Sequence, residues 1–374
     1  MRNALKLALH TTLALLARTA SAQATADTAT IGLRLDAMTF FDNKEFTSNI
    51  KKGYTLPGLY IEPALEYTYG AFDLRAGIHT AYLAGADTAK RLIPTLLIAY
   101  SPTPWFELQL GTLPRSLRRL PEPLYKPEKL FISLPPTGLE FILNRPNVLA
   151  NMWIDWERYI KHGSPFQEEF MVGLSGQYST NGEANIQNPN GFSSNLYAVI
   201  THAGGQIDTT NLPVTSVANI GIAAAFGLPL GTRTSLGVRL SAYVSSDISP
   251  NPHLEFERGH ALHGTIWLKT LKGLMAEAGY WQAKHFINPR GEELFGSVST
   301  ISSAFNQPHR QLITAQASYT VGPIGGFELR FGAGLYADIN QIKANSSQGA
   351  ADYYYTLTLR YNGQLFRKKL TKTP

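Results

Sequence analysis

The sequence predicts an all-β fold: a transmembrane antiparallel up-and-down β-barrel of about sixteen strands in the outer membrane of a Gram-negative cell. Three observations support this prediction. The chain of 374 residues begins with an export signal. The remainder lacks an apolar run long enough for a spanning helix, but alternates apolar and polar residues over long segments. Short and long connections between these segments also alternate, as in outer-membrane barrels.

The first 22 residues have the organisation of a cleaved signal peptide. Arg2 and Lys6 precede an apolar stretch, Leu7 to Ala17, and Ala20-Ser21-Ala22 has the small-x-small form that signal peptidase cuts. An N-terminal membrane helix is disfavoured because the apolar stretch is too short to span a bilayer. We therefore expect cleavage after Ala22, with residues 23–374 forming the barrel.

Composition excludes several classes of protein. The chain contains no cysteine, so it carries no lipid anchor on cysteine, no disulfide and no cysteine-ligated metal. The net charge of +6 falls to +3 when the signal peptide is removed, a modest excess that gives no reason to expect nucleic-acid binding. His260 and His263 are three apart on an expected strand and should face opposite sides, so we expect no metal site there and no cofactor.

Strands are predicted wherever one face is apolar and the other carries charges and glycine. The clearest, in chain order, are Thr30 to Phe40, Leu59 to Tyr69, Phe72 to Tyr82, Phe327 to Tyr336 and Tyr353 to Tyr361. Their apolar faces are aliphatic at the centre and aromatic at the margins, which suits a bilayer with aromatic girdles. A soluble β-sandwich also alternates, but its strands average about five or six residues. Face assignment is least defined in the central third of the chain.

Connections supply an independent argument for a barrel. The expected short turns are at Gly70-Ala71, Ser101 to Pro104, Asn144 to Asn147, Leu228 to Thr232, Thr270 to Gly273 and Gly322 to Gly326. Long connections fall between them, and a sandwich has no reason to alternate in this way. Thr180 to Gly191 is an exception, because it is long yet belongs to the short side. Either this turn is extended, or strands in the middle are misplaced.

Charged residues fall opposite the apolar faces and are expected to line a polar interior. A charge facing hydrocarbon costs about 2 to 4 kcal/mol at mid-depth, so these side chains must point to water or to partners inside the barrel. The predicted lumen-facing residues include Arg34, Glu62, Arg75 and Arg330. The pattern leaves open whether the lumen conducts or is closed by salt bridges.

The long loop at residues 112–136 is rich in basic residues and proline. One interpretation is a constriction that folds into the lumen, where Arg115, Arg118 and Arg119 would favour anions. The alternative is a surface loop whose basic residues contact lipopolysaccharide phosphates. After Phe366, residues 367–374 form a basic segment that we expect to be a solvated periplasmic tail.

Four stretches resemble an uncharacterised, porin-like family of outer-membrane barrels from Gram-negative bacteria. They are Phe40-Phe41-Asp42-Asn43-Lys44-Glu45-Phe46, Gly53-Tyr54-Thr55-Leu56-Pro57-Gly58, Gly111-Thr112-Leu113-Pro114-Arg115 and Phe286-Ile287-Asn288-Pro289-Arg290-Gly291. The resemblance implies a barrel and a surface location, and it carries no activity or site.

The predicted function is a porin-like channel for passive diffusion of small hydrophilic solutes, with outer-membrane lipids and lipopolysaccharide around it and no chemical step. The alternative is a closed barrel that acts in surface binding or envelope assembly, with a partner lipoprotein or a glycan held by the loops Asp42 to Gly58 and His285 to Pro308. An enzyme is not expected, because His162-Gly163-Ser164 has no evident acidic partner. The oligomeric state is not predicted.

Overall fold

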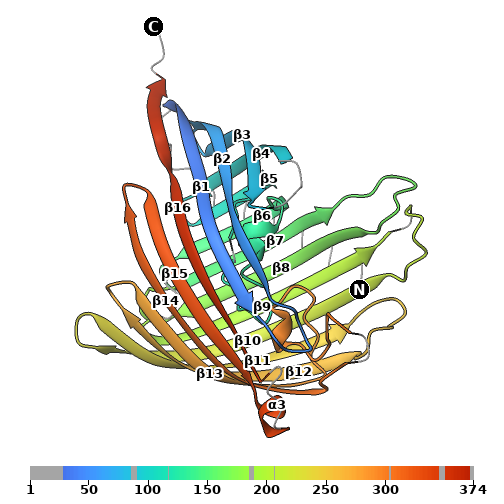
Figure 1. Cartoon of the computed structure of the whole chain (residues 1–374). Coiled ribbons are helices and arrows are strands. Elements are labelled where there is room, and N and C mark those ends of the chain that lie inside the picture. Colours follow the sequence, from blue (N-terminus) through green and yellow to red (C-terminus); the bar gives the residue numbers. More distant parts are fainter. Residues whose placement is uncertain are drawn as a thin grey trace, which may run out of the picture.

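The computed structural model describes residues 28–85, 91–116, 118–184, 189–205, 207–302, 305–344 and 350–370. Within these ranges, sixteen antiparallel strands form one closed barrel, in which each strand pairs with its sequence neighbours and β1 pairs with β16 (Figure 1). The predicted fold class and strand number are confirmed. The expected signal peptide, residues 1–22, lies outside the described residues, so cleavage after Ala22 stays a prediction.

The strands are β1 (Ala29–Glu45), β2 (Tyr54–Tyr69), β3 (Phe72–Leu83), β4 (Arg91–Thr103), β5 (Phe106–Thr112), β6 (Thr137–Arg145), β7 (Val148–Arg158), β8 (Glu168–Ser179), β9 (Gly191–Gly204), β10 (Thr215–Leu230), β11 (Thr234–Asp247), β12 (Arg258–Thr270), β13 (Leu274–Lys284), β14 (His309–Ile324), β15 (Phe327–Asp338) and β16 (Ala351–Leu370). Among the described residues, three short helices lie in loops: α2 (Lys129–Ile132), η1 (Glu293–Phe295) and α3 (Ile339–Lys343). Throughout the part of the chain that is described, no helix has the length and apolar character needed to cross a membrane.

The outer surface of the barrel is an apolar band. Large aliphatic side chains such as Ile222, Leu240 and Leu357 are exposed along the middle of the strands. Aromatic side chains stand at its margins, with Tyr69 near one end and Trp156 near the other. Such a band matches the hydrocarbon layer and its two interfaces, so the protein is an outer-membrane barrel.

The two ends of the barrel differ as the sequence predicts. Tight turns and both ends of the described chain lie at one end, here called the short-turn end, and α3 lies at the opposite, long-loop end (Figure 1). The exceptional connection, Thr180 to Gly191, lies on the short-turn side, because β8 and β9 pair from Glu168 with Gly204 to Ser179 with Ser193.

The expected tail at residues 367–374 is corrected in part. β16 continues to Leu370 and stays paired with β1, with Ile31 opposite Lys368 and Ala29 opposite Leu370. The strand extends past Phe366 because β1 begins at Ala29 and offers a free edge to those residues. Residues 371–374 lie outside the described chain.

Three long-loop segments turn inward and build the core of the molecule inside the barrel. They are residues 46–53, 113–136 and 285–308, which together we call the plug. Its apolar residues form one buried cluster with lumen-facing residues of the wall, and Phe286, Leu294 and Phe295 of the plug are wholly buried beside Trp281 of β13. The long-loop half of the lumen is therefore filled by protein.

Candidate functional site: the lumen and its plug

Backbone hydrogen bonds join the three plug segments to one another. The Lys126 amide donates to the Arg290 carbonyl at 2.9 Å, the Glu292 amide to the Glu122 carbonyl at 2.8 Å and the Thr300 amide to the Ile50 carbonyl at 2.8 Å. A Cβ atom on Gly291 would lie 2.1 Å from the Pro123 carbonyl oxygen, so only glycine permits this approach. The plug is thus one connected body.

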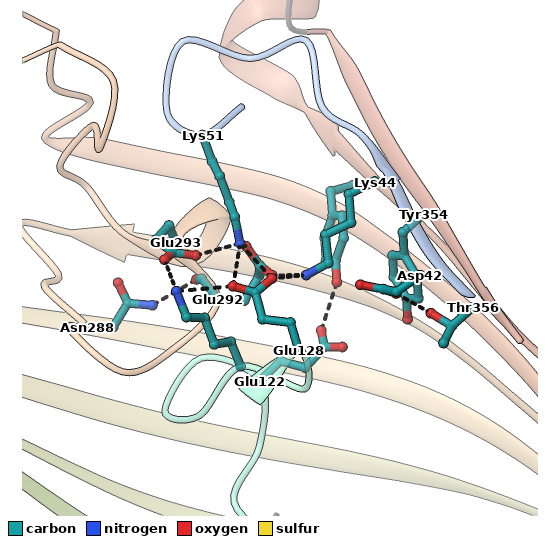
Figure 2. A network of polar contacts seen from close by, with 12 residues as sticks. Asp42, Lys44, Lys51, Glu122, Glu128, Asn288, Glu292, Glu293, Tyr354 and Thr356 are labelled. Atoms are coloured by element: carbon teal, nitrogen blue, oxygen red, sulfur yellow. Dashed lines mark hydrogen bonds and ion pairs between the residues drawn. The ribbon is translucent and has the colours of Figure 1, made fainter. Parts of the chain in front are cut away.

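A buried network of lysines and glutamates holds the plug together (Figure 2). Lys44 Nζ of β1 lies 2.6 Å from Glu128 Oε2 and 3.0 Å from Glu292 Oε2. Lys51 Nζ lies 2.9 Å from Glu292 Oε1 and 2.7 Å from Glu293 Oε2. Because Glu128 belongs to 113–136, Lys51 to 46–53 and Glu292 to 285–308, these charges tie all three segments to the wall.

The network is sealed from water, which makes its pairing energetically important. The Glu292 side chain is 2% exposed. Burial alone would raise the pKa of this carboxyl, but the adjacent Lys44 and Lys51 hold the pKa of Glu292 below its ordinary value, so it stays ionised. Removing one member of such a buried set leaves an uncompensated charge, at a cost of about 3 to 5 kcal/mol.

Glu122 joins the plug to the wall. The Tyr336 hydroxyl of β15 donates to Glu122 Oε2 at 2.9 Å, and Gln316 Nε2 of β14 donates at 3.1 Å. Burial, followed by the nearby charge of Glu292, raises the pKa of Glu122 to about 7, while the hydrogen bond from Tyr336 acts in the opposite direction.

Other wall residues fix the segment 285–308. Arg310 Nε of β14 donates to the Leu294 carbonyl at 2.8 Å, and its guanidinium also pairs with Asp338. Trp281 Nε1 donates to the Phe295 carbonyl at 3.2 Å, and Asn219 Nδ2 of β10 to the Ile287 carbonyl at 2.6 Å. Donors from three strands therefore hold this loop inside the barrel.

The predicted basic segment turns inward, but two of its arginines meet carboxylates on the wall. Arg115 Nε lies 3.1 Å from Glu62 Oε1, and His79 Nδ1 lies 2.6 Å from the same oxygen. Arg118 Nε lies 3.3 Å from Glu140 Oε1. Both arginine side chains are buried and neutralised.

Arg119 occupies a different position in this segment. It is exposed and adopts a left-handed backbone with φ of 57°. The structure therefore does not bring the three predicted arginines to one common point.

The remaining predicted residues face the short-turn half of the lumen. Arg75 bridges Glu66 at 3.0 Å and Asp73 at 2.5 Å. Arg34 bonds to Asn362, and Arg330 is exposed. This half of the lumen keeps polar side chains in contact with water.

The plug network is not predicted by the sequence, although one sequence signal for it is present. Arg34 and Asp36 face inward, and every second residue of a strand lies on the same face, so Asp42 and Lys44 of β1 face inward as well. This alternation places a lysine inside the barrel. No sequence pattern predicts that Glu128 and Glu292 lie inside the barrel, because they lie in loops, where side chains do not alternate between two faces.

A histidine and a serine meet on the outer face. His202 Nδ1 of β9 lies 2.8 Å from Ser216 Oγ of β10, near the long-loop end, and the His202 ring stacks on Phe170. No carboxylate among the described residues is paired with His202. The motif that the sequence offered, His162-Gly163-Ser164, is a turn in which Ser164 Oγ accepts from the Lys161 amide at 2.9 Å. His260 faces outward and His263 inward, as expected.

Comparison with known proteins supports the barrel and adds a family. OprD of Pseudomonas aeruginosa has a similar structure, with a TM-score of 0.53 at 13% identity over 92% of this chain and 96% of that chain. OccAB1 of Acinetobacter baumannii gives 0.51 at 11% identity over 92% and 99%. These likenesses bear on fold alone, and at that level the expected porin-like barrel is confirmed.

No curated protein sequence is detectably similar to the chain. A family model described as lipid A 3'-O-deacylase-type matches residues 23–370, which is nearly all of the chain beyond the expected signal peptide. The protein therefore belongs to the lipid A 3'-O-deacylase-type family.

Proposed function

We propose that the protein is an outer-membrane channel for passive diffusion of small hydrophilic solutes, with the plug as its constriction. The observation that carries this proposal is the exposed polar face of the short-turn half of the lumen, where Arg330 is exposed and Arg75 and Arg360 remain partly exposed. Such charges require water, so the interior is aqueous up to the plug.

Selectivity in this channel follows from which charges remain open to the solute. Arg115 and Arg118 add little net field at the constriction, because Glu62 and Glu140 neutralise them. Arg330 of the lumen wall is exposed and would favour anions weakly, within a Debye length of about 8 to 10 Å.

A liposome-swelling assay tests the proposal against its rival, the closed barrel. On this proposal the plug narrows the lumen without closing it, so purified protein in liposomes should admit small sugars faster than larger ones. Empty liposomes serve as the control. Swelling no faster than in the control would favour the closed barrel that binds a partner lipoprotein or glycan.

A second function, hydrolysis of an acyl ester, is favoured by the family match and by the pair His202 and Ser216. The pair lies on the lipid side of the wall, where an acyl chain of lipid A could reach it. Ser216 Oγ would attack the ester carbonyl while His202 accepts its proton, and the ester C–O bond would break as the lipid A hydroxyl leaves with that proton. Water would then hydrolyse the acyl-serine and release the fatty acid. This function ranks second because no described carboxylate orients His202.

Release of fatty acid from purified lipid A tests the second function. The wild-type protein should release it, and Ser216→Ala and His202→Ala should not. Ser241→Ala, on the lumen face of β11, is the matched control and should keep the activity. Absence of release by the wild-type protein would remove this candidate.

A further inference from the structure

The barrel wall has a notch at its long-loop end. β5 has only seven residues, whereas β4 has thirteen. β4 pairs with β3 as far as Arg91, but with β5 only as far as Leu97. On the other side of the notch, β7 runs on to Arg158, beyond its last pair with β6 at Asp155. Over this height, the described part of the wall has no strand between β4 and β7.

The plug segment 113–136 leaves and re-enters the wall at this notch. The Leu113 amide donates to the Pro136 carbonyl at 2.8 Å, and Thr112 Oγ1 accepts from the Leu96 amide at 3.2 Å. A cavity of about 300 Å³ lies beside this neck.

The lining of this notch cavity is polar on one side and apolar on the other. Arg115, Lys129 and Glu157 line it from the lumen side. Pro94, Leu134 and Trp156 line it from the outer side. The cavity therefore crosses the wall, from the edge of the plug to the surface that faces lipid.

The outer mouth lies at the membrane interface. Trp156 packs on Phe170 with ring centroids 5.5 Å apart, and its Nε1 donates to Glu168 Oε1 at 2.9 Å, as an interfacial tryptophan does. Leu92 and Leu96 on the open edge of β4 are 71% and 51% exposed, so hydrocarbon lies directly beside the opening.

We propose that the notch cavity binds a single-chain amphiphile taken from the outer leaflet. Its chain would lie along Pro94, Leu134 and Trp156, and its small polar head would reach Ser116, Ser133 and the ion pair of Lys129 with Glu157. The volume is at the lower end of ligand cavities, which suits one chain and excludes a lipid with several. The inference is independent of the channel proposal.

The polar end of the cavity sets the chemistry of the head group. Lys129 Nζ lies 2.6 Å from Glu157 Oε1, and Arg115 is paired with Glu62, so both signs of charge are present and balanced. A head that accepts hydrogen bonds from Lys129 and the two serine hydroxyls fits this end. The carboxylate of a free fatty acid and the phosphate of a lysophospholipid share that chemistry.

Cysteine protection tests the site, because the chain contains no native cysteine. Ser133→Cys in nanodiscs should react with a small thiosulfonate reagent, and added palmitate should slow the reaction several-fold, with saturation near one palmitate per protein. Ser235→Cys, on the lumen face of β11, is the control and should not be protected. Lysophosphatidylethanolamine in a parallel titration distinguishes the two sources of the amphiphile.

A second variant separates binding from simple membrane partition. Trp156→Ala in the Ser133→Cys background should weaken protection about tenfold, because it removes an aromatic wall of the cavity. Trp105→Ala, in a short turn at the other end of the barrel, should leave protection unchanged. Protection that rises linearly without saturation, or that is equal in both tryptophan variants, would overturn the proposal.

Discussion

The two halves of the lumen are lined by the same strands, yet they differ in how far water reaches their charges. In the long-loop half, the Lys44 and Glu292 side chains are 6% and 2% exposed. In the short-turn half, the Arg75 and Arg360 side chains are 28% and 32% exposed. Charges are paired in both halves, so pairing is not the difference. Strand alternation determines which residues face inward, and the inward-folded loops determine whether water reaches those residues.

The largest effect is expected where a charge is removed from the sealed half. Glu292→Ala leaves Lys44 and Lys51 short of a partner and should lower the stability of the plug by about 3 to 5 kcal/mol. Hydrogen exchange of the segment 285–308 measures this. Glu328→Ala, opposite Arg360 in the short-turn half, should cost less than about 1 kcal/mol. Equal costs would show that the two halves do not differ as described.

Arg115 tests the junction between plug and wall. Arg115→Ser removes the contacts of this side chain with Glu62 and His79, which then keep only each other, and should destabilise the segment 113–136 by about 2 to 3 kcal/mol, again followed by hydrogen exchange. Arg115→Lys should rescue only part of this loss, because lysine cannot bond both groups from a planar fork. An unchanged exchange rate in Arg115→Ser would place this side chain outside the network.

The pH dependence of plug stability offers another test of the difference between the two halves of the lumen. The folded-state pKa of Glu122 is raised from 4.5 to about 7, so its stabilising contribution is complete below pH 4.5 and is lost as the pH rises through about 7. Plug closure should therefore weaken by about 1 to 2 kcal/mol between about pH 6 and 8. Glu122→Gln stays neutral and should abolish the change. A pH response that persists in this variant would assign it to another group.

The smallest effect is expected in the wet half. Arg330→Ser should shift the reversal potential in a salt gradient by a few millivolts toward cations without altering stability, because this side chain is exposed and screened. A matched change of the buried Arg118 should act mainly on stability instead. A large loss of stability in Arg330→Ser would mean that the short-turn half is packed rather than wet.

Sequence patterns predicted the wall well because the pleat of a strand is rigid. Arg34, Glu62, Arg75 and Arg330 face inward, since adjacent side chains must point to opposite faces. The end of β16 was misplaced at Phe366, because the pairing that extends it depends on where β1 begins.

The plug could not be predicted in the same way. Lys44 pairs with Glu128 and Glu292, which lie 84 and 248 positions further along the chain. No local sequence pattern predicts contacts between residues so far apart. Gly291 is a second sequence signal for the plug, because only glycine allows the Pro123 carbonyl to approach this closely. A single glycine in a loop does not identify the residue that packs against it.

Unit conductance in planar bilayers tests the central claim most directly, namely that a wet lumen is narrowed by the plug. The wild-type protein is compared with a variant in which residues 287–299 are replaced by a glycine–serine linker of equal length. The account predicts small, discrete current steps for the wild type and steps several-fold larger for the variant. Equal conductance in the two proteins, or none in either, would contradict it.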